Sequence, residues 1–201
     1  MKFTKIPENT FRELQVNAGV LLTAFDPATG VLDMEALITA TTGGIKLDIV
    51  PTIEDFGADV DNCPKNSKEL ARKTETDITM SCTALNFNEN TVKMALGAAE
   101  TRSADGAIVL RTDLKQTDFK TIWFVGDLAD GGYIAVKLID ALSTGGFTLQ
   151  TSDKGKGKTG LTFKAFASLA SQDMAPVEIY LGQPEEDEPA PQGDDDGDDE
   201  E

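Results

Sequence analysis

The sequence predicts a mainly β domain: an antiparallel sandwich or open barrel flanked by one α-helix. About ten short apolar or β-branched runs recur along the chain, which is the pattern expected of such folds. Turns rich in Gly, Pro and Asp separate these runs, and an amphipathic helical stripe occurs only once. At 201 residues, the chain has the length of one well-packed domain.

The expected strands are spread over both halves of the chain. In order, they are 18–25, 35–42, 45–53, 74–87, 107–112, 119–125, 133–141, 146–151, 160–169 and 177–181.

Two of these runs indicate how they are buried. In 74–87, Ile78, Met80, Cys82 and Ala84 alternate with Thr79, Ser81 and Thr83, so one face is apolar and the other is a ladder of hydroxyls. The run 119–125 is apolar on both faces after Lys120, which is typical of a central strand.

The single helix is expected over roughly 90–100. Asn88 or Asn90 is a suitable N-cap, because a short amide side chain can accept a hydrogen bond from the first turn. The apolar stripe consists of Val92, Ala95, Leu96 and Ala99.

We expect four segments along the chain. Residues 1–15 form an extended N-terminal arm, 16–182 form the β domain, and 183–201 form a disordered acidic tail. Within the domain, 54–73 has no periodicity and is expected to be a long loop. Loops of that length are uncommon in compact domains and are usually functional or partner-bound, although a simple surface excursion is the alternative.

The net charge of −17 is concentrated at the C-terminal end. Residues 183–201 contain 11 of the 35 acidic residues and none of the 18 basic ones, so residues 1–182 carry only −6. The body also lacks a Lys/Arg cluster of the kind that marks a nucleic-acid binder.

The composition argues against an enzyme. The chain contains no histidine, which removes Ser-His and Cys-His triads and most zinc sites. Cys63 and Cys82 lie in no metal-like spacing, and Cys82 is expected to be a small buried residue. No apolar run of the length needed to span a membrane occurs, and no signal peptide opens the chain, so we expect it to begin in a cytosol.

Two short motifs suggest ligand binding, and both fail on position. Residues 152–159 end in Gly157-Lys158-Thr159 like a phosphate loop, but Ser152 replaces the first glycine, and an alternating strand pattern follows where a helix is required. Asp194, Asp196 and Asp198 match the first ligands of a calcium loop, but Asp199 occupies the position of its glycine. We expect neither a metal nor a cofactor.

The acidic cluster Glu54, Asp55, Asp59 and Asp61 could supply a carboxylate pair for glycoside hydrolysis or hold a divalent cation. It lies in one loop without aromatic platforms for a sugar. Solvation of the loop or contacts between subunits are the competing interpretation.

Three stretches of the chain resemble a known family. They are 49–66 (Ile49-Val50-Pro51-Thr52-Ile53-Glu54-Asp55-Phe56-Gly57 through Asn66), 110–127 with Ile122-Trp123-Phe124-Val125-Gly126-Asp127, and 141–157. Together they resemble the major tail protein, or tail-tube protein, of long-tailed phages and prophages of Gram-positive bacteria. The acidic C-terminal tail departs from the family and leaves open whether a C-terminal decoration domain is missing.

The resemblance implies a tail-tube type of fold and a structural role. Copies would close hexameric rings that stack into a tube for DNA delivery, with a tape measure, a tail terminator and a baseplate as partners. Such a protein is assembled in the bacterial cytoplasm and resides in the virion tail. DNA would pass without specific binding, since a mildly acidic body with a hydroxyl face offers few anchors for phosphate. The long loop would then reach from ring to ring; its candidate contact residues are Phe56, Asp59, Asp61, Asn62, Pro64 and Lys65.

Three alternatives remain open. The tube could belong to a contractile injection particle or tailocin. An acidic binding module or DNA mimic would use the net charge, although most of that charge lies in the tail. A carboxylate-dependent hydrolase would rest on residues 54–61 alone.

Overall fold

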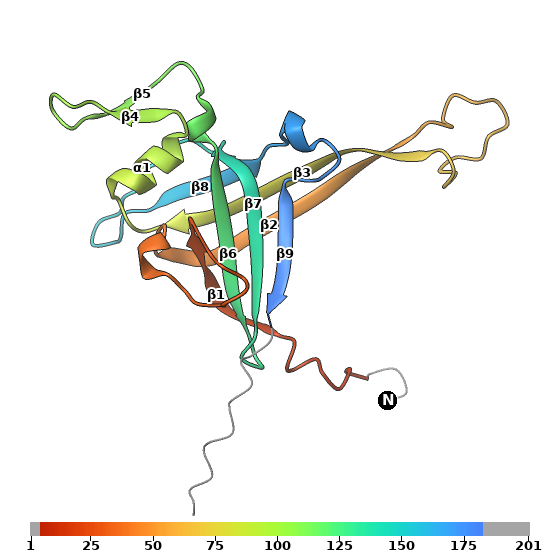
Figure 1. The fold of residues 1–201 in the computed structure, drawn as a ribbon, viewed down its shortest axis with the longest axis horizontal. Coiled ribbons are helices and arrows are strands. Elements are labelled where there is room, and N and C mark those ends of the chain that lie inside the picture. Colours follow the sequence, from red (N-terminus) through yellow and green to blue (C-terminus); the bar gives the residue numbers. More distant parts are fainter. Residues whose placement is uncertain (1–4, 183–201) are drawn as a thin grey trace, which may run out of the picture.

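The computed structural model describes residues 5–182 as one curled antiparallel sheet with a helix and a small ribbon against it (Figure 1). Seven strands form the sheet in the order β1-β6-β7-β8-β3-β2, with β9 also paired to β7, and β4 and β5 form the ribbon. The prediction of a mainly β antiparallel fold with one α-helix is confirmed. The elements are β1 (Gln15–Leu22), β2 (Thr41–Asp55), β3 (Ala71–Ala84), α1 (Glu89–Leu96), β4 (Ala99–Thr101), β5 (Ile108–Leu110), β6 (Lys120–Leu128), β7 (Tyr133–Ser143), β8 (Thr159–Ala165) and β9 (Val177–Gly182), with 3₁₀ turns η1 (Met34–Ala36), η2 (Gln116–Asp118) and η3 (Leu169–Ser171).

The sheet forks along one edge of β7. The first part of β7 pairs with β9 up to Leu138, and its last part pairs with β8 from Ala141 onward. Between them lies a β-bulge in which Asp140 has a φ of 49°. Because a bulge bends its strand and increases the local twist, β9 and β8 leave β7 in different directions.

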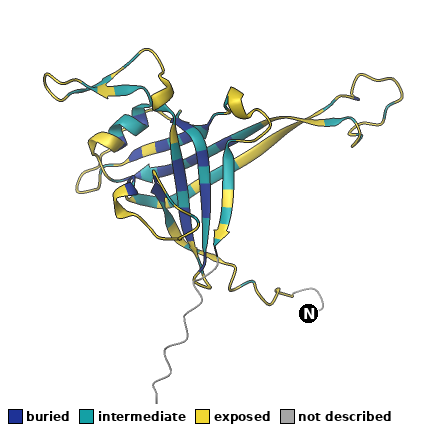
Figure 2. Ribbon diagram, viewed as in Figure 1, coloured by how far each residue is buried: buried dark blue, intermediate teal, exposed yellow. Residues whose placement is uncertain are grey.

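The main core fills the space between the two arms of the fork. One arm contains β1, β6, β9 and the first part of β7, and the other contains β8, β3 and β2. Most of the buried residues come from β6 and β7 on one side and from β3 and β8 on the other (Figure 2). Its buried residues are Leu21, Ile38, Ile78, Met80, Cys82, Ala84, Ala95, Ile122, Val136, Leu138, Ala141, Leu161, Phe163 and Ala165. The predicted alternation of 78–84 is confirmed, since its even-numbered residues are buried.

A second core covers the opposite face of β6 and β7. Trp123, Val125 and Ala135 pack there with Phe25, which belongs to the loop after β1. The Phe25 ring meets the Trp123 ring edge-on at a centroid distance of 5.6 Å. Strand β6 is therefore buried on both faces, as the sequence predicted for a central strand.

Helix α1 begins where the sequence indicated and ends earlier. The Asn88 side chain accepts a hydrogen bond from the Thr91 amide, at 2.8 Å, and so caps the first turn. Gly97 has a φ of 75°, which stops the helix after Leu96 rather than near residue 100. The buried positions are Thr91 and Ala95, while Ala99 belongs to β4.

Two predicted strands are wrong. In 35–42, the Asp33 side chain accepts a hydrogen bond from the Glu35 amide and starts the turn η1, so β2 begins only at Thr41. In 146–151, the only ladder contact in the described chain is the single bridge from Gln150 to Lys158. The apolar residues Phe147 and Leu149 are exposed, so no buried face fixes a strand there.

The predicted segment boundaries also change. Strand β2 continues through Glu54, opposite Arg72, so the connection to β3 is 56–70 rather than 54–73. Of the predicted arm 1–15, residues 5–14 precede β1, and the Leu14 carbonyl accepts a hydrogen bond from the Ala129 amide in the β6–β7 turn. The predicted disordered tail 183–201 lies outside the described residues, as do Asp194, Asp196 and Asp198.

Both cysteines are free. Burial raises the pKa of the Cys82 thiol to about 11, so this residue packs as an uncharged apolar side chain. Among residues 5–182, no helix has the length and apolar character needed to cross a membrane.

Truncation of Leu161 tests the core between the two arms. Leu161 is 0% exposed, so Leu161→Ala should lower the free energy of unfolding by about 2–5 kcal/mol, through lost contacts and the resulting cavity. The matched control is Leu169→Ala, because Leu169 is 87% exposed; it should change stability by less than about 0.5 kcal/mol. Urea denaturation of both variants measures the difference, and equal losses would contradict this position of the core.

Candidate functional site

The hairpin of β2 and β3 extends well beyond the rest of the sheet (Figure 1). Its register runs from Thr41 opposite Ala84 to Asp55 opposite Ala71. Strand β8 pairs with β3 only from Thr79 onward, so in the described chain the outer part of the hairpin is a two-stranded ribbon. Such a ribbon has little core of its own and is suited to contacts with another molecule.

The tip of the hairpin is a folded turn organised by Asp55. The Asp55 carboxylate accepts hydrogen bonds from the Gly57 amide, at 2.9 Å, and from the Asn66 amide, at 2.8 Å. Gly57 is buried against Leu70 and Cys63, where a Cβ atom would lie 2.7 Å from the Leu70 side chain. The sequence did not reveal this organisation, although an Asp two residues before a Gly is a turn signal.

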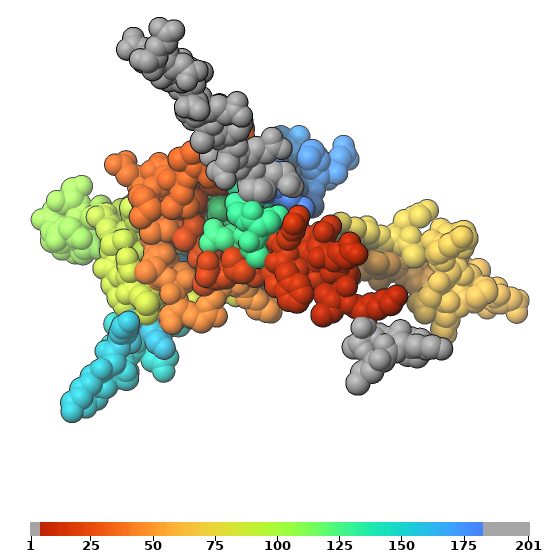
Figure 3. Space-filling model, turned by 90° about the horizontal axis from the view of Figure 1, so that it is seen from below, coloured from red at the N-terminus to blue at the C-terminus, as the bar shows by residue number. Residues whose placement is uncertain are grey.

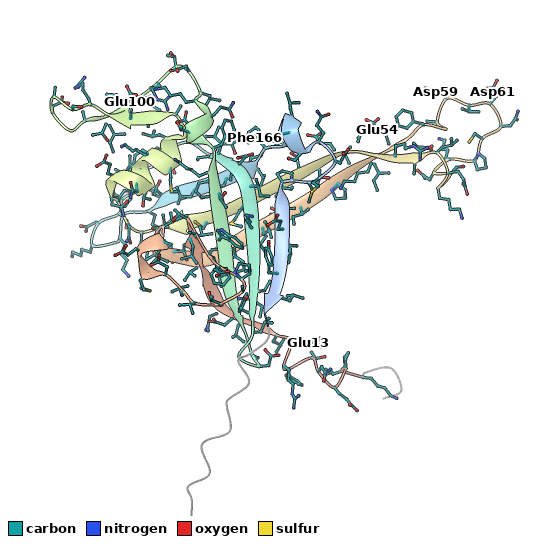
Figure 4. All side chains as sticks on the ribbon, viewed as in Figure 1. Glu13, Glu54, Asp59, Asp61, Glu100 and Phe166 are labelled. Carbon is teal, nitrogen blue, oxygen red and sulfur yellow. The ribbon has the colours of Figure 1, made fainter. Side chains whose placement is uncertain are left out.

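The predicted contact residues all lie on the exposed surface of this tip. Figure 4 shows Asp59 and Asp61 at its far end and Glu54 closer to the body. The exposed set is Phe56, Asp59, Asp61, Asn62, Pro64 and Lys65.

The carboxylates of the tip are either hydrogen-bonded to backbone amides or exposed. Asp55 is engaged with backbone amides, and Asp59 and Asp61 point into solvent. Within residues 5–182, no group of three His, Cys, Asp or Glu residues could hold a metal ion. The tip instead combines carboxylates with exposed apolar side chains, such as Phe56 and Val60.

Strands β2 and β9 have open edges. Within residues 5–182, β2 pairs only with β3, and β9 pairs only with β7. The third edge strand of this sheet, β1, is partly covered, because Leu22 bridges to Leu37 and the Ile38 amide donates a hydrogen bond to the Leu21 carbonyl. The open edge of β2 is fifteen residues long, and β9 exposes Ile179 and Leu181, at 55% and 68%. Open edges with apolar side chains are sites for pairing with a further strand.

The outer face of β2, β3 and β8 carries hydroxyls and paired charges. Thr79, Ser81 and Thr83 lie on this face, and Thr162 of β8 stands opposite Ser81. This confirms the predicted hydroxyl ladder on the face that turns away from the main core.

The lysines of this face are held by carboxylates. Lys46 lies 2.6 Å from Asp48, and Lys164 contacts Asp77. The hydrogen bond from Lys164 to Asp77, followed by the Coulombic attraction of the same carboxylate, raises the pKa of Lys164. The face therefore contains positive charges that are already neutralised within the chain.

The segment 152–159, which resembles a phosphate loop, lies in a hairpin turn closed by Gln150 and Lys158. The Gln150 and Lys158 backbones exchange two hydrogen bonds, each of 3.0 Å, and β8 follows directly. Since a strand and not a helix follows Lys158 directly, the turn lacks the ring of helix N-terminal amides that binds phosphate in such loops.

A hollow beside α1 has a volume of about 680 Å³. Cations on its wall are paired: Lys93 lies 2.7 Å from Glu89, and Arg111 contacts Asp118. A backbone hydrogen bond from Lys115 and the Arg111 guanidinium lower the pKa of Asp118. The Arg111–Asp118 pair joins the end of the β4–β5 ribbon to the segment before β6, whereas the Lys93–Glu89 pair lies within α1.

The comparisons with known proteins find distant structural likenesses. No family model matches the chain, and no curated protein matches it. A chain in the virion of a native gene transfer agent particle is similar over 75% of this chain and 92% of that chain, with 10% identity and a TM-score of 0.41. A chain in the tail of an empty gene transfer agent particle, computed with helical refinement and C6 symmetry, is similar over the same shares, with 9% identity and a TM-score of 0.36. These likenesses are remote, and no residue of this chain takes a role from them.

Removing the carboxylate beside Lys164 tests whether neutralisation of its lysines keeps the hydroxyl face from binding DNA. In Asp77→Asn, the freed lysine should bind phosphate, and the slope of log K against log salt for a short DNA duplex should steepen by about 0.9. Glu75→Gln is the matched control, because Glu75 acts on Lys164 only through space. Fluorescence anisotropy at several salt concentrations measures DNA binding by both variants. Equal slopes would mean that net charge alone sets the salt dependence and would contradict a specific effect of the Lys164–Asp77 pair.

Proposed function

We propose that this chain is a structural subunit of a phage tail tube and has no enzymatic activity. Copies assemble into rings, hexameric as the sequence resemblance implies, and the rings stack to form a channel for DNA delivery. The observation that supports this best is the open edge of β2, which is fifteen residues long and is available for pairing with a strand of the next copy.

The open edges favour a ring rather than a closed dimer. The described chain offers two different edges, β2 at one end of the sheet and β9 on the fork. Pairing of one edge with a different edge of the next copy is a head-to-tail contact, which repeats around a ring. Each contact would satisfy backbone groups that otherwise attract other chains and cause aggregation.

The hydroxyl face suits the wall of the channel. Thr and Ser side chains interact with water, and the neutralised Lys46 and Lys164 offer DNA phosphates few sites for ion exchange. A wall of this kind allows DNA to slide without specific binding.

The β2–β3 hairpin suits contacts between successive rings. It projects from the body and ends in an exposed, folded tip with Phe56, Asp59, Asp61, Asn62, Pro64 and Lys65. In this arrangement, the tape measure, tail terminator and baseplate are the remaining partners. The protein assembles in the host bacterial cytoplasm and resides in the virion tail, and the same subunit geometry would serve a contractile particle or tailocin.

Shortening the hairpin separates ring formation from stacking. Replacing residues 56–70 by Asn-Gly, which forms a tight two-residue turn, should leave the sheet folded and the rings intact but prevent long tubes. Negative-stain electron microscopy of concentrated protein measures both states, and circular dichroism checks the fold. Wild-type protein that stays monomeric under all conditions would overturn the proposed function, and long tubes from the shortened variant would overturn the role of the hairpin.

Deleting residues 183–201 distinguishes a tube subunit from an acidic DNA mimic. The deletion removes 11 of the 35 acidic residues, so a mimic that relied on them would lose its partner. A tube subunit should still fold and polymerise, because the open edges and the hairpin lie outside the deleted segment. Sedimentation of the truncated and full-length proteins checks this, and loss of polymerisation would count against the tube.

A further inference from the structure

A second hairpin, residues 144–158, projects from the body and ends in a basic turn. Lys154, Lys156 and Lys158 are exposed, and only Asp153 opposes them within 150–158. Within residues 5–182, the ion pairs include none of these three lysines, so no described carboxylate lies in an ion pair with them.

This basic turn has an apolar base. Phe87 and Leu149 are exposed there, and Gly157 lies against both. A Cβ atom at residue 157 would be 3.2 Å from the Phe87 ring, so glycine allows the turn to lie close on the aromatic side chain. An exposed apolar base next to free lysines is typical of a protein-binding surface rather than of a phosphate site.

The first part of the β2–β3 tip has the complementary composition. Residues 54–61 contain four carboxylates and no basic residue, whereas Lys65 and Lys68 lie in the second part of the tip. Phe56 and Val60 are exposed in the first part, as is the neighbouring Ile53. Each hairpin thus offers apolar side chains with charges of opposite sign. Such surfaces attract each other and repel a second copy of themselves.

The two hairpins of one molecule point away from each other. In Figures 1 and 3, the 144–158 hairpin leaves one side of the body and the 56–70 tip leaves the opposite side. They therefore cannot meet within one chain. In a head-to-tail assembly, every copy offers one acidic tip and one basic hairpin.

We propose that the basic 144–158 hairpin of one copy is the docking site for the acidic β2–β3 tip of a second copy. Lys154 and Lys156 attract Asp59 and Asp61, while Phe87 and Leu149 cover Phe56 and Val60. The proposal rests on the assembly proposed above and names the partner surface of its contact tip. Nucleic acid is the other polyanion that the lysines could attract, but phosphates would leave the apolar base uncovered.

A charge exchange between the two hairpins tests the pairing. Lys154→Glu/Lys156→Glu makes the protein more acidic, and Asp59→Lys/Asp61→Lys makes it less acidic by the same amount. Each pair of changes places like charges opposite each other, so each should raise the critical concentration for polymerisation by about tenfold or more. The combined four-residue variant has the wild-type net charge and restores opposite charges, so it should return toward the wild-type value.

Sedimentation and light scattering measure the critical concentration, and thermal melting confirms that each variant is folded. Lys154→Arg/Lys156→Arg is the charge-preserving control and should polymerise like wild type. The inference is overturned if both charge-reversal variants polymerise normally. It is overturned too if Lys154→Glu/Lys156→Glu weakens assembly while Asp59→Lys/Asp61→Lys strengthens it, since net charge alone would then be responsible. It is also overturned if reversal of the lysines abolishes binding of a DNA duplex while assembly is unchanged. Those outcomes leave the proposed function intact, whereas wild-type protein that never assembles would remove both.

Discussion

Strand β7 pairs with two different strands, β9 and β8, along the same edge, and the rest of the structure depends on this double pairing. The bulge at Asp140 separates the part of β7 that pairs with β9 from the part that pairs with β8. Because the strand bends there, the sheet divides into two arms that can pack against each other. The main core lies between those arms, and their outer strands, β2 and β9, are left with open edges.

These open edges link the fold to the proposed function. A monomer with a fifteen-residue exposed edge is prone to unwanted pairing, whereas an assembly turns the same backbone groups into specific contacts. In the proposed assembly, charge would select among the arrangements of neighbouring copies, because the acidic tip and the basic hairpin lie on opposite sides of the body. The paired Lys46 and Lys164 leave the hydroxyl face close to neutral, although two of its residues are basic.

The sequence predicted those parts of the fold in which burial produces a pattern. The alternation from Ile78 to Ala84 and the two-sided apolar run after Lys120 follow directly from packing on one or both faces. The end of β2 could not be predicted, because its outer half is exposed on both faces and Val50 and Pro51 interrupt the alternation. The change of partner at Asp140 leaves no local signal, since it is imposed by strands distant in sequence. For the candidate site, the sequence located the exposed tip residues but not the hydrogen bonds of Asp55 that fold the tip.

The central claim is that neighbouring copies pair with the open edge of β2. Amide hydrogen exchange, followed by mass spectrometry, measures this directly in the free and the assembled protein. Peptides covering Thr41–Asp55 should exchange faster in the free protein and become protected on assembly, while the already paired β6 should change little. Equal exchange of the β2 peptides in both states would contradict the claim.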